Sequence, residues 1–217
     1  MNYKEILESE YFIETYSKIE ELKKDFYVNH GFIHISGVIN NAQYLADIFG
    51  LNAKQKELLL IASALHDIGY LKGREGHAKN GGILVREYLN GKMPEEDIDV
   101  VVNAVSSHGG KREEDFKCPV SMCLILADKL DFTKVRYKDD GKEHSSLPLF
   151  LSIEKVVLEK LGEKNFKLLI HTTKTELFNN LEENYFFGKL FEVFRKIESV
   201  CGYIIEVDFM QVHESGL

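Results

Sequence analysis

The segment LLLIASALHDIG, residues 58–69, constrains the fold more than any other part of the chain. Apolar residues from Leu58 to Leu65 cover the whole circumference of a helix, so this helix must be buried on every side. The segment nevertheless ends in His66 and Asp67. A carboxylate inside a protein costs several kcal/mol unless it is paired or bound to a metal. The fold must therefore provide Asp67 with a partner for its charge.

Two other apolar segments carry polar groups with the same need. PVSMCLILADKL predicts a helix that carries Asp128, and VVNAVSSHGG predicts a helix that ends at His108. Taken singly, a histidine on an apolar face is more often a hydrogen-bonded core residue, and Asp128 could cap a neighbouring helix or pair with Arg136. Together, imidazoles and carboxylates on several helices are the donors that divalent metals use in open, hydrolytic sites. The joint pattern predicts a metal site inside a helical bundle.

Helical periodicity extends over the first two thirds of the chain. After the polar stretch 138–146, segments rich in β-branched and apolar residues follow. The expected helices span about 3–27, 33–49, 52–68, 77–90, 94–108 and 119–131. FLSIEKVVLEKL and NFKLLIHTT then predict two strands joined by a turn at 162–165, before a helix over about 174–200 and the strand YIIEVDFMQV. We expect a mainly helical domain over 1–145 and a small β-β-α-β appendage over 146–217, which we interpret as a packing or oligomerisation element.

Charge and composition exclude several classes of function. The chain has 35 acidic and 27 basic residues, a formal charge of −8, which disfavours general binding to nucleic acids or anionic membranes. We find neither a signal-peptide pattern nor an apolar stretch long enough to span a bilayer. Three cysteines without metal-type spacing fit reduced packing residues in a cytoplasmic protein. A homo-oligomer is compatible with this composition.

The order of His34, His66-Asp67 and Asp128 resembles the HD superfamily of metal-dependent phosphohydrolases. HISGVINNAQYLA is similar to that family's first-histidine helix, ALHDIG to its signature dipeptide segment, and LADKLD to its final aspartate segment. The similarity covers about the first 140 residues. It implies an HD-type helical bundle in which a metal-activated water cleaves a phosphate ester or anhydride of a nucleotide-like small molecule.

Two further histidines extend the resemblance. His77 and His108 lie between signature and final aspartate, where binuclear branches of the superfamily carry extra ligands. The pattern is closest to the bacterial branch that hydrolyses symmetrical dinucleoside tetraphosphates. It implies a bridging role for Asp67, a catalytic role for His66 and Asp67, and six metal ligands: His34, His66, Asp67, His77, His108 and Asp128. The implied cofactor is two divalent transition-metal ions, Fe, Mn, Co or Ni, with Mg or Zn as alternatives.

Other residues near these segments bear on the site. Gly81 and Gly82 support His77, because each costs about 1 kcal/mol against Ala in a helix unless another backbone comes close. Gly31 argues against a helical metal pair between His30 and His34, so His30 is not assigned to the site, and neither are His144, His171 and His213. Basic residues concentrated near the ligand-bearing segments are the candidates for substrate binding: Lys72, Arg74, Lys129 and Arg136.

The sequence differs from two other branches of the HD superfamily, and these differences reduce the number of candidate activities. Ile68 and Gly69 follow the signature where guanosine tetraphosphate hydrolases carry an acidic pair, and the Gly-Tyr-Pro segment of cyclic-di-GMP phosphodiesterases is missing. Both of those activities are disfavoured. The main alternative to an enzyme is a regulatory HD module that binds a nucleotide without turnover. A third hypothesis is an assembly protein with a structural metal.

Overall fold

The computed structural model describes residues 1–22, 28–137, 142, 144, 146–179, 181 and 184–213. Its helices are α1 (Tyr3–Leu7), α2 (Glu10–Leu22), α3 (Phe32–Ile48), α4 (Ala53–Leu65), α5 (His77–Leu89), α6 (Glu95–Ser107), α7 (Pro119–Lys129), α8 (Leu147–Leu151) and α9 (Tyr185–Cys201). Short 3-10 helices are η1 (Ile68–Lys72), η2 (Glu113–Phe116), η3 (Lys134–Arg136) and η4 (Thr175–Phe178), and the strands are β1 (Ile153–Lys160), β2 (Asn165–Thr172) and β3 (Ile204–Gln211).

Helix α4 is the central element of the helical part. Every residue from Leu58 to Leu65 is buried, as the sequence predicts, and the helix packs against α1, α3, α6 and α7. Asn52 caps its first turn in a reciprocal capping box with Gln55. Because α4 ends at Leu65, His66 and Asp67 begin the next segment inside the protein rather than at its surface.

The N-terminal segment differs from the single helix expected over 3–27. It forms α1 and α2, and the Ser9 hydroxyl at the break donates to the carbonyl of Ile6 and accepts from the amide of Phe12. This side chain satisfies backbone groups that a continuous helix would pair internally. Residues 23–27 of the expected helix lie outside the described part of the chain.

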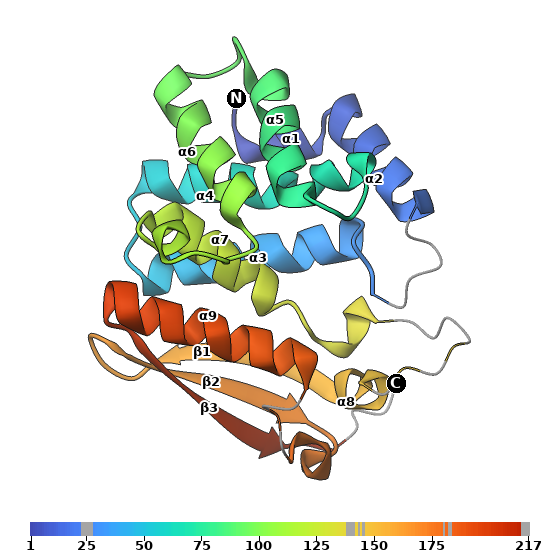
Figure 1. Ribbon diagram of the computed structural model, residues 1–217, viewed down its shortest axis with the longest axis vertical. Coiled ribbons are helices and arrows are strands. Elements are labelled where there is room, and N and C mark those ends of the chain that lie inside the picture. Colours follow the sequence, from blue (N-terminus) through green and yellow to red (C-terminus); the bar gives the residue numbers. More distant parts are fainter. Residues whose placement is uncertain are drawn as a thin grey trace.

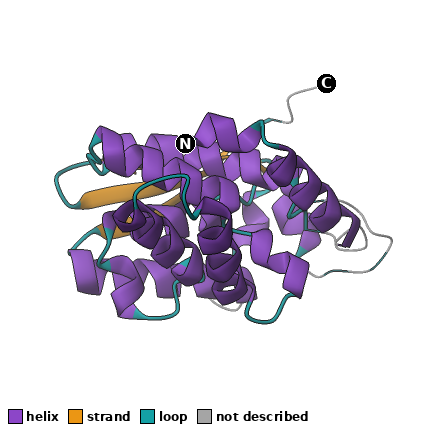
Figure 2. Cartoon of the chain, turned by 90° about the horizontal axis from the view of Figure 1, so that it is seen from above, coloured by secondary structure: helices purple, strands orange, loops and turns teal. Residues whose placement is uncertain are grey.

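The C-terminal part confirms the β-β-α-β order. Strand β1 pairs antiparallel with β2, β2 pairs parallel with β3, and the sheet order is β1-β2-β3. Helix α9 makes the crossover that parallel strands require. It lies between the sheet and the helical part (Figure 1), and Figure 2 shows the helices lying over the strands. Its apolar face is buried in a core continuous with that of the helical part.

Two boundaries in this region differ from expectation. The start of FLSIEKVVLEKL belongs to α8, because Pro148 favours the first turn of a helix and three apolar side chains of this short helix are buried. The expected helix over 174–200 begins only at Tyr185, where the Asn184 side chain accepts hydrogen bonds from the first-turn amides. Among the described residues, no helix is both long and apolar enough to cross a membrane.

Close backbone approach explains the glycines of α5. A Cβ added at Gly81 would lie 3.3 Å from the carbonyl oxygen of His66, and one at Gly82 would lie 1.9 Å from the hydroxyl of Ser106. A Cβ at Gly69 would lie only 1.8 Å from the carbonyl oxygen of His77. These glycines let α5 pack directly on η1 and α6, which brings His77 to the end of α4.

Replacing Gly69 by Ala should separate η1 from α5. The new methyl group meets a backbone carbonyl, which cannot rotate away, so we expect a loss of about 1–3 kcal/mol in the free energy of unfolding, typical of overpacking. Urea denaturation measures it. Gly162→Ala is the control, because its Cβ would lie 3.7 Å from the nearest atom, an ordinary contact. Equal stability of both variants would contradict this packing.

Candidate metal centre

The Asp67 carboxylate lies between two groups of side chains. Its Oδ2 atom is 3.5 Å from Nε2 of His34 and 3.5 Å from Nε2 of His66. Oδ1 of Asp128 completes this first group, at 3.3 Å from Nε2 of His34 and 3.9 Å from Nε2 of His66. All four residues are buried, and the ligand atoms of His34, His66 and Asp128 all lie within 4.8 Å of one another.

The other oxygen of Asp67 faces the second group. Oδ1 lies 3.6 Å from Nε2 of His108 and 3.9 Å from Nε2 of His77, and these two nitrogens are 3.1 Å apart. The six residues implied as ligands by the resemblance therefore come together from α3, α5, α7 and the ends of α4 and α6. One carboxylate touches both groups, which is the arrangement a bridging ligand requires. Their binding of metal stays a prediction.

Each of the four imidazoles is held through Nδ1. The acceptors are Asp131 Oδ2 for His34 (2.6 Å), the Ser63 carbonyl for His66 (2.9 Å), the Arg74 carbonyl for His77 (3.0 Å) and the Val105 carbonyl for His108 (2.7 Å). A carbonyl or carboxylate cannot donate, so Nδ1 carries the proton, and in the neutral ring Nε2 then carries the lone pair. Such acceptors behind metal-binding histidines set the tautomer and aim the ring.

Helix ends supply two of these anchors. His66 and His108 stand at the C-caps of α4 and α6, where the last-turn carbonyls have no partner within the helix. Each ring donates to the carbonyl three residues before it, and its Nε2 faces Asp67; the Val105 carbonyl also accepts from the backbone amide of His108. Local helix termination thus orients one imidazole in each group.

The paired Nε2 atoms are a test of whether these residues fit a metal. His34 and His66 approach to 3.2 Å, and His77 and His108 to 3.1 Å, through nitrogens that carry lone pairs. Two lone pairs repel at this distance unless a cation or proton lies between them. Nitrogens bound to one transition-metal ion at about 2.0–2.1 Å are separated by this order of distance. The donor set fits a cation.

The pKa shifts of the carboxylates and of His108 also fit a bound cation. Burial alone would raise the pKa of the Asp67 carboxyl, but the surrounding histidines, His66 first, hold it well below its usual range. Burial is likewise outweighed at Asp128, where the Lys129 ammonium and His34 keep the pKa low. Burial lowers the pKa of His108 to about 4. Anionic carboxylates and neutral imidazoles are the protonation states that bind metal.

Two residues that the sequence analysis left out also reach the site. His30 precedes α3 in a loop, and its Nδ1 lies 3.1 Å from Oδ2 of Asp67. The helix begins after Gly31, so a helical pair with His34 does not form, but the loop brings His30 to Asp67 by another route. Asp131 orients His34 from behind. The sequence offered one sign that Asp131 could reach the site, namely its position three residues after Asp128.

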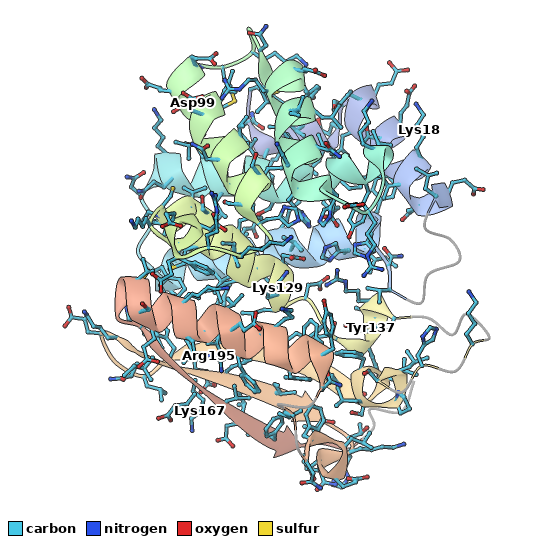
Figure 3. All side chains as sticks on the ribbon, viewed as in Figure 1. Lys18, Asp99, Lys129, Tyr137, Lys167 and Arg195 are labelled. Carbon is cyan, nitrogen blue, oxygen red and sulfur yellow. The ribbon has the colours of Figure 1, made fainter. Side chains whose placement is uncertain are left out.

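A cavity of about 520 Å³ opens over Asp67 and both metal groups. Three of the four basic residues predicted to bind substrate line it: Arg74, Lys129 and Arg136. Lys129, labelled in Figure 3, lies 2.7 Å from Asp128, and buried Arg136 donates to the Asp131 carbonyl and lies 3.3 Å from Nε2 of His34. Lys72 is exposed and is not among the lining residues. Lys111, another basic residue close to a ligand-bearing segment, lines the cavity as well.

Comparison with known proteins bears on the helical part. A family model described as HD domain matches residues 31–133. This range starts just before α3 and ends beyond α7, and it contains all six residues of the two groups together with Asp131. His30 and Arg136 lie just outside it. No curated protein matches the chain.

Removing the anchor behind His34 should weaken metal binding. Asp131→Asn keeps the shape but replaces the acceptor charge with an amide, and loss of such a partner commonly costs 10–100-fold in metal affinity. We expect a decrease of about that size, measured by competition with a chelator. Asp115→Asn is the matched control, because Asp115 is another buried carboxylate but pairs with Arg112. Equal affinity in both variants would refute the anchoring role.

Acidification should destabilise the metal-free protein. Burial lowers the pKa of His30 and of His108 to about 4, below their ordinary value of 6.5. The unfolded chain therefore binds more protons between these values, and stability present above pH 6.5 is lost as the pH falls toward 4. His34 opposes this in part: despite burial, its carboxylate partners raise its pKa. We expect a net loss of about 2 kcal/mol between pH 7 and 5, roughly 4–8 °C in Tm.

Thermal melts in the presence of a chelator measure this dependence. His108→Gln removes one of the buried groups, so its melting temperature should vary less with pH. His213→Gln is the control, because that histidine is exposed at the far end of the chain. A wild-type Tm that stays level or rises on acidification would contradict the assignment of neutral imidazoles.

Proposed function

We propose that this chain, whose residues 31–133 match the HD-domain family model, is a metal-dependent phosphohydrolase. The observation that carries the proposal is the buried Asp67 carboxylate, whose two oxygens face two separate groups of metal-binding side chains. The expected substrate is a phosphate ester or anhydride of a nucleotide-like small molecule. When bound, one or two divalent cations would activate a water for attack and polarise the phosphoryl oxygens.

Different residues of the chain would hold each of the two cations. His34, His66 and Asp128 would hold one cation with Oδ2 of Asp67, and His77 and His108 would hold the other with Oδ1. Nitrogen and oxygen donors without thiolate suit Fe, Mn, Co or Ni, with Mg or Zn as alternatives. A binuclear centre is the finer part of the proposal, and it rests on the separation of the two groups across one carboxylate.

The cations of the cavity have two different roles. Lys129 and Arg136 contact Asp128 and Asp131, so they hold carboxylates of the metal centre in place. Arg74 and Lys111 form no ion pair with any residue that the structure describes, and both line the cavity. Unpaired cations suit the phosphate oxygens of a substrate, because phosphoryl transfer depends on positioning and charge neutralisation. We assign substrate binding primarily to Arg74 and Lys111.

Several features favour an enzyme that acts on a small anion. The chain has a net charge of −8, yet basic residues gather at this cavity, which favours a small phosphorylated molecule over a nucleic-acid polymer. A structural metal site is usually closed, whereas these groups line a cavity. The six residues in their order further support the branch that hydrolyses symmetrical dinucleoside tetraphosphates, so these compounds belong among the first substrates tested.

Metal analysis combined with phosphate release tests the proposal. We expect up to two transition-metal ions per chain and phosphate release from some member of a panel of mononucleotides, dinucleoside polyphosphates and sugar phosphates. A chelator should abolish release at neutral pH, and added Mn, Fe, Co or Ni should restore it. Asp67→Asn removes the shared charge, so it should lower turnover more than about 100-fold and weaken metal binding.

Two outcomes would separate the alternatives. Asp115→Asn should behave like wild type and controls for the loss of a buried carboxylate. Full hydrolysis after verified metal removal, or wild-type turnover in Asp67→Asn, would falsify the mechanism. Nucleotide binding without phosphate release under any metal would identify a regulatory module instead.

A further inference from the structure

Helix α9 of the C-terminal part forms one wall of the cavity over the metal centre. Its residues along that wall are Tyr185, Phe186, Lys189, Glu192, Val193 and Lys196. Their spacing of three and four residues places most of them on one side of the helix, while Phe187, Leu190, Phe194 and Ile197 are buried in the core. The helix that crosses over the sheet therefore has a second, more polar face turned to the site.

This wall is tied to the loop that follows His108. The Lys196 ammonium donates to the carbonyl of Gly110 at 3.0 Å. Gly110 has a φ of +60°, and a Cβ there would lie 2.9 Å from Ile125 and 3.4 Å from Val193, so the loop packs closely between α7 and α9. Because the same loop carries Lys111, the position of α9 is coupled to that of a proposed phosphate-binding cation.

Tyr185 differs from the two aromatic residues that follow it. The ring of Phe186 packs 5.1 Å from that of Phe132, and the ring of Phe187 packs 5.7 Å from the same ring. Tyr185 is 80% exposed although it lines the cavity. Among the described residues its ring makes no ring–ring contact, and the Lys189 ammonium lies 5.9 Å from the ring centre. A large flat side chain is thus left open to solvent at the site.

We propose that Tyr185 is a specificity-determining residue whose ring stacks on a flat ring of the substrate. The proposal rests on the proposed function, since it places the substrate's phosphate at the metal centre and its ring against α9. A cavity of about 520 Å³ is within the usual size of small-molecule sites, and aromatic side chains stack on ring systems of many kinds. Compounds that bear a ring are then preferred over phosphate esters of the same backbone without one.

Nucleoside 5′-monophosphates and ribose 5-phosphate form a matched pair of probes, because they differ only in the base. Titration calorimetry on the metal-loaded, full-length protein measures the affinity for AMP, GMP, CMP, UMP and ribose 5-phosphate. We expect wild type to prefer at least one nucleotide over ribose 5-phosphate. In Tyr185→Ala that preference should fall about tenfold, the order of effect typical of a lost base–aromatic stack. Tyr185→Phe, which keeps the ring, should retain it.

Arg195→Ala is the control on the same helix. Arg195, labelled in Figure 3, is exposed and is not among the residues lining the cavity. It should show the wild-type preference, and thermal melts should show that all three variants fold, since both altered side chains are largely exposed. Wild-type affinities that do not distinguish nucleotides from ribose 5-phosphate, or an undiminished preference in Tyr185→Ala, would overturn the proposal.

The binding readout separates this proposal from the enzymatic one. Loss of the nucleotide preference in Tyr185→Ala supports the stacking role even if no metal-loaded form releases phosphate, in which case only the hydrolase function fails. If phosphate is released but the ratio of kcat/KM for nucleotide and ribose 5-phosphate is the same in wild type and Tyr185→Ala, the stacking role fails and the hydrolase function stands.

Discussion

The buried charge of Asp67 is the constraint around which the rest of the helical part is arranged. Helix α4 is apolar on all sides and ends inside the protein, so the carboxylate that follows it cannot be solvated. Imidazoles from four other positions surround it, and their Nδ1 atoms are already occupied by acceptors. The Nε2 atoms still face one another in pairs at 3.2 and 3.1 Å, and of these four only that of His34 has a described donor, Arg136, nearby. A bound cation would relieve this crowding and would balance the Asp67 charge, which His30 offsets only in part.

Close backbone packing decides where the second group of candidate ligands lies. Gly69 and Gly81 allow η1 and α5 to approach until backbone atoms touch, and His77 is the first residue of α5. A side chain at Gly69 would push this helix away and carry His77 with it. The glycines therefore connect local conformational freedom to the geometry of the site, because the distance between two helices sets the distance between an imidazole and the shared carboxylate.

The C-terminal part takes part in the site through one helix with two faces. The apolar face of α9 stabilises the sheet, and the other face closes the cavity opposite the metal groups. The helical part carries the candidate metal ligands, and the exposed residues of α9 line the same cavity from another element. Lys196 limits that freedom, since its bond to Gly110 sets the position of the wall relative to His108.

The sequence by itself determined the elements and most of the centre. Hydrophobic periodicity is local, so it located the buried helix, the β-β-α-β order and the polar groups that such a core cannot leave alone. The cost of glycine inside a helix also predicted that another backbone comes close to Gly81. Only the tertiary structure decided that His30 and Asp131 reach the site, that Arg74 lines the cavity whereas Lys72 does not, and that α9 forms a wall. These relations depend on side-chain directions between segments far apart in the chain, which no local pattern encodes.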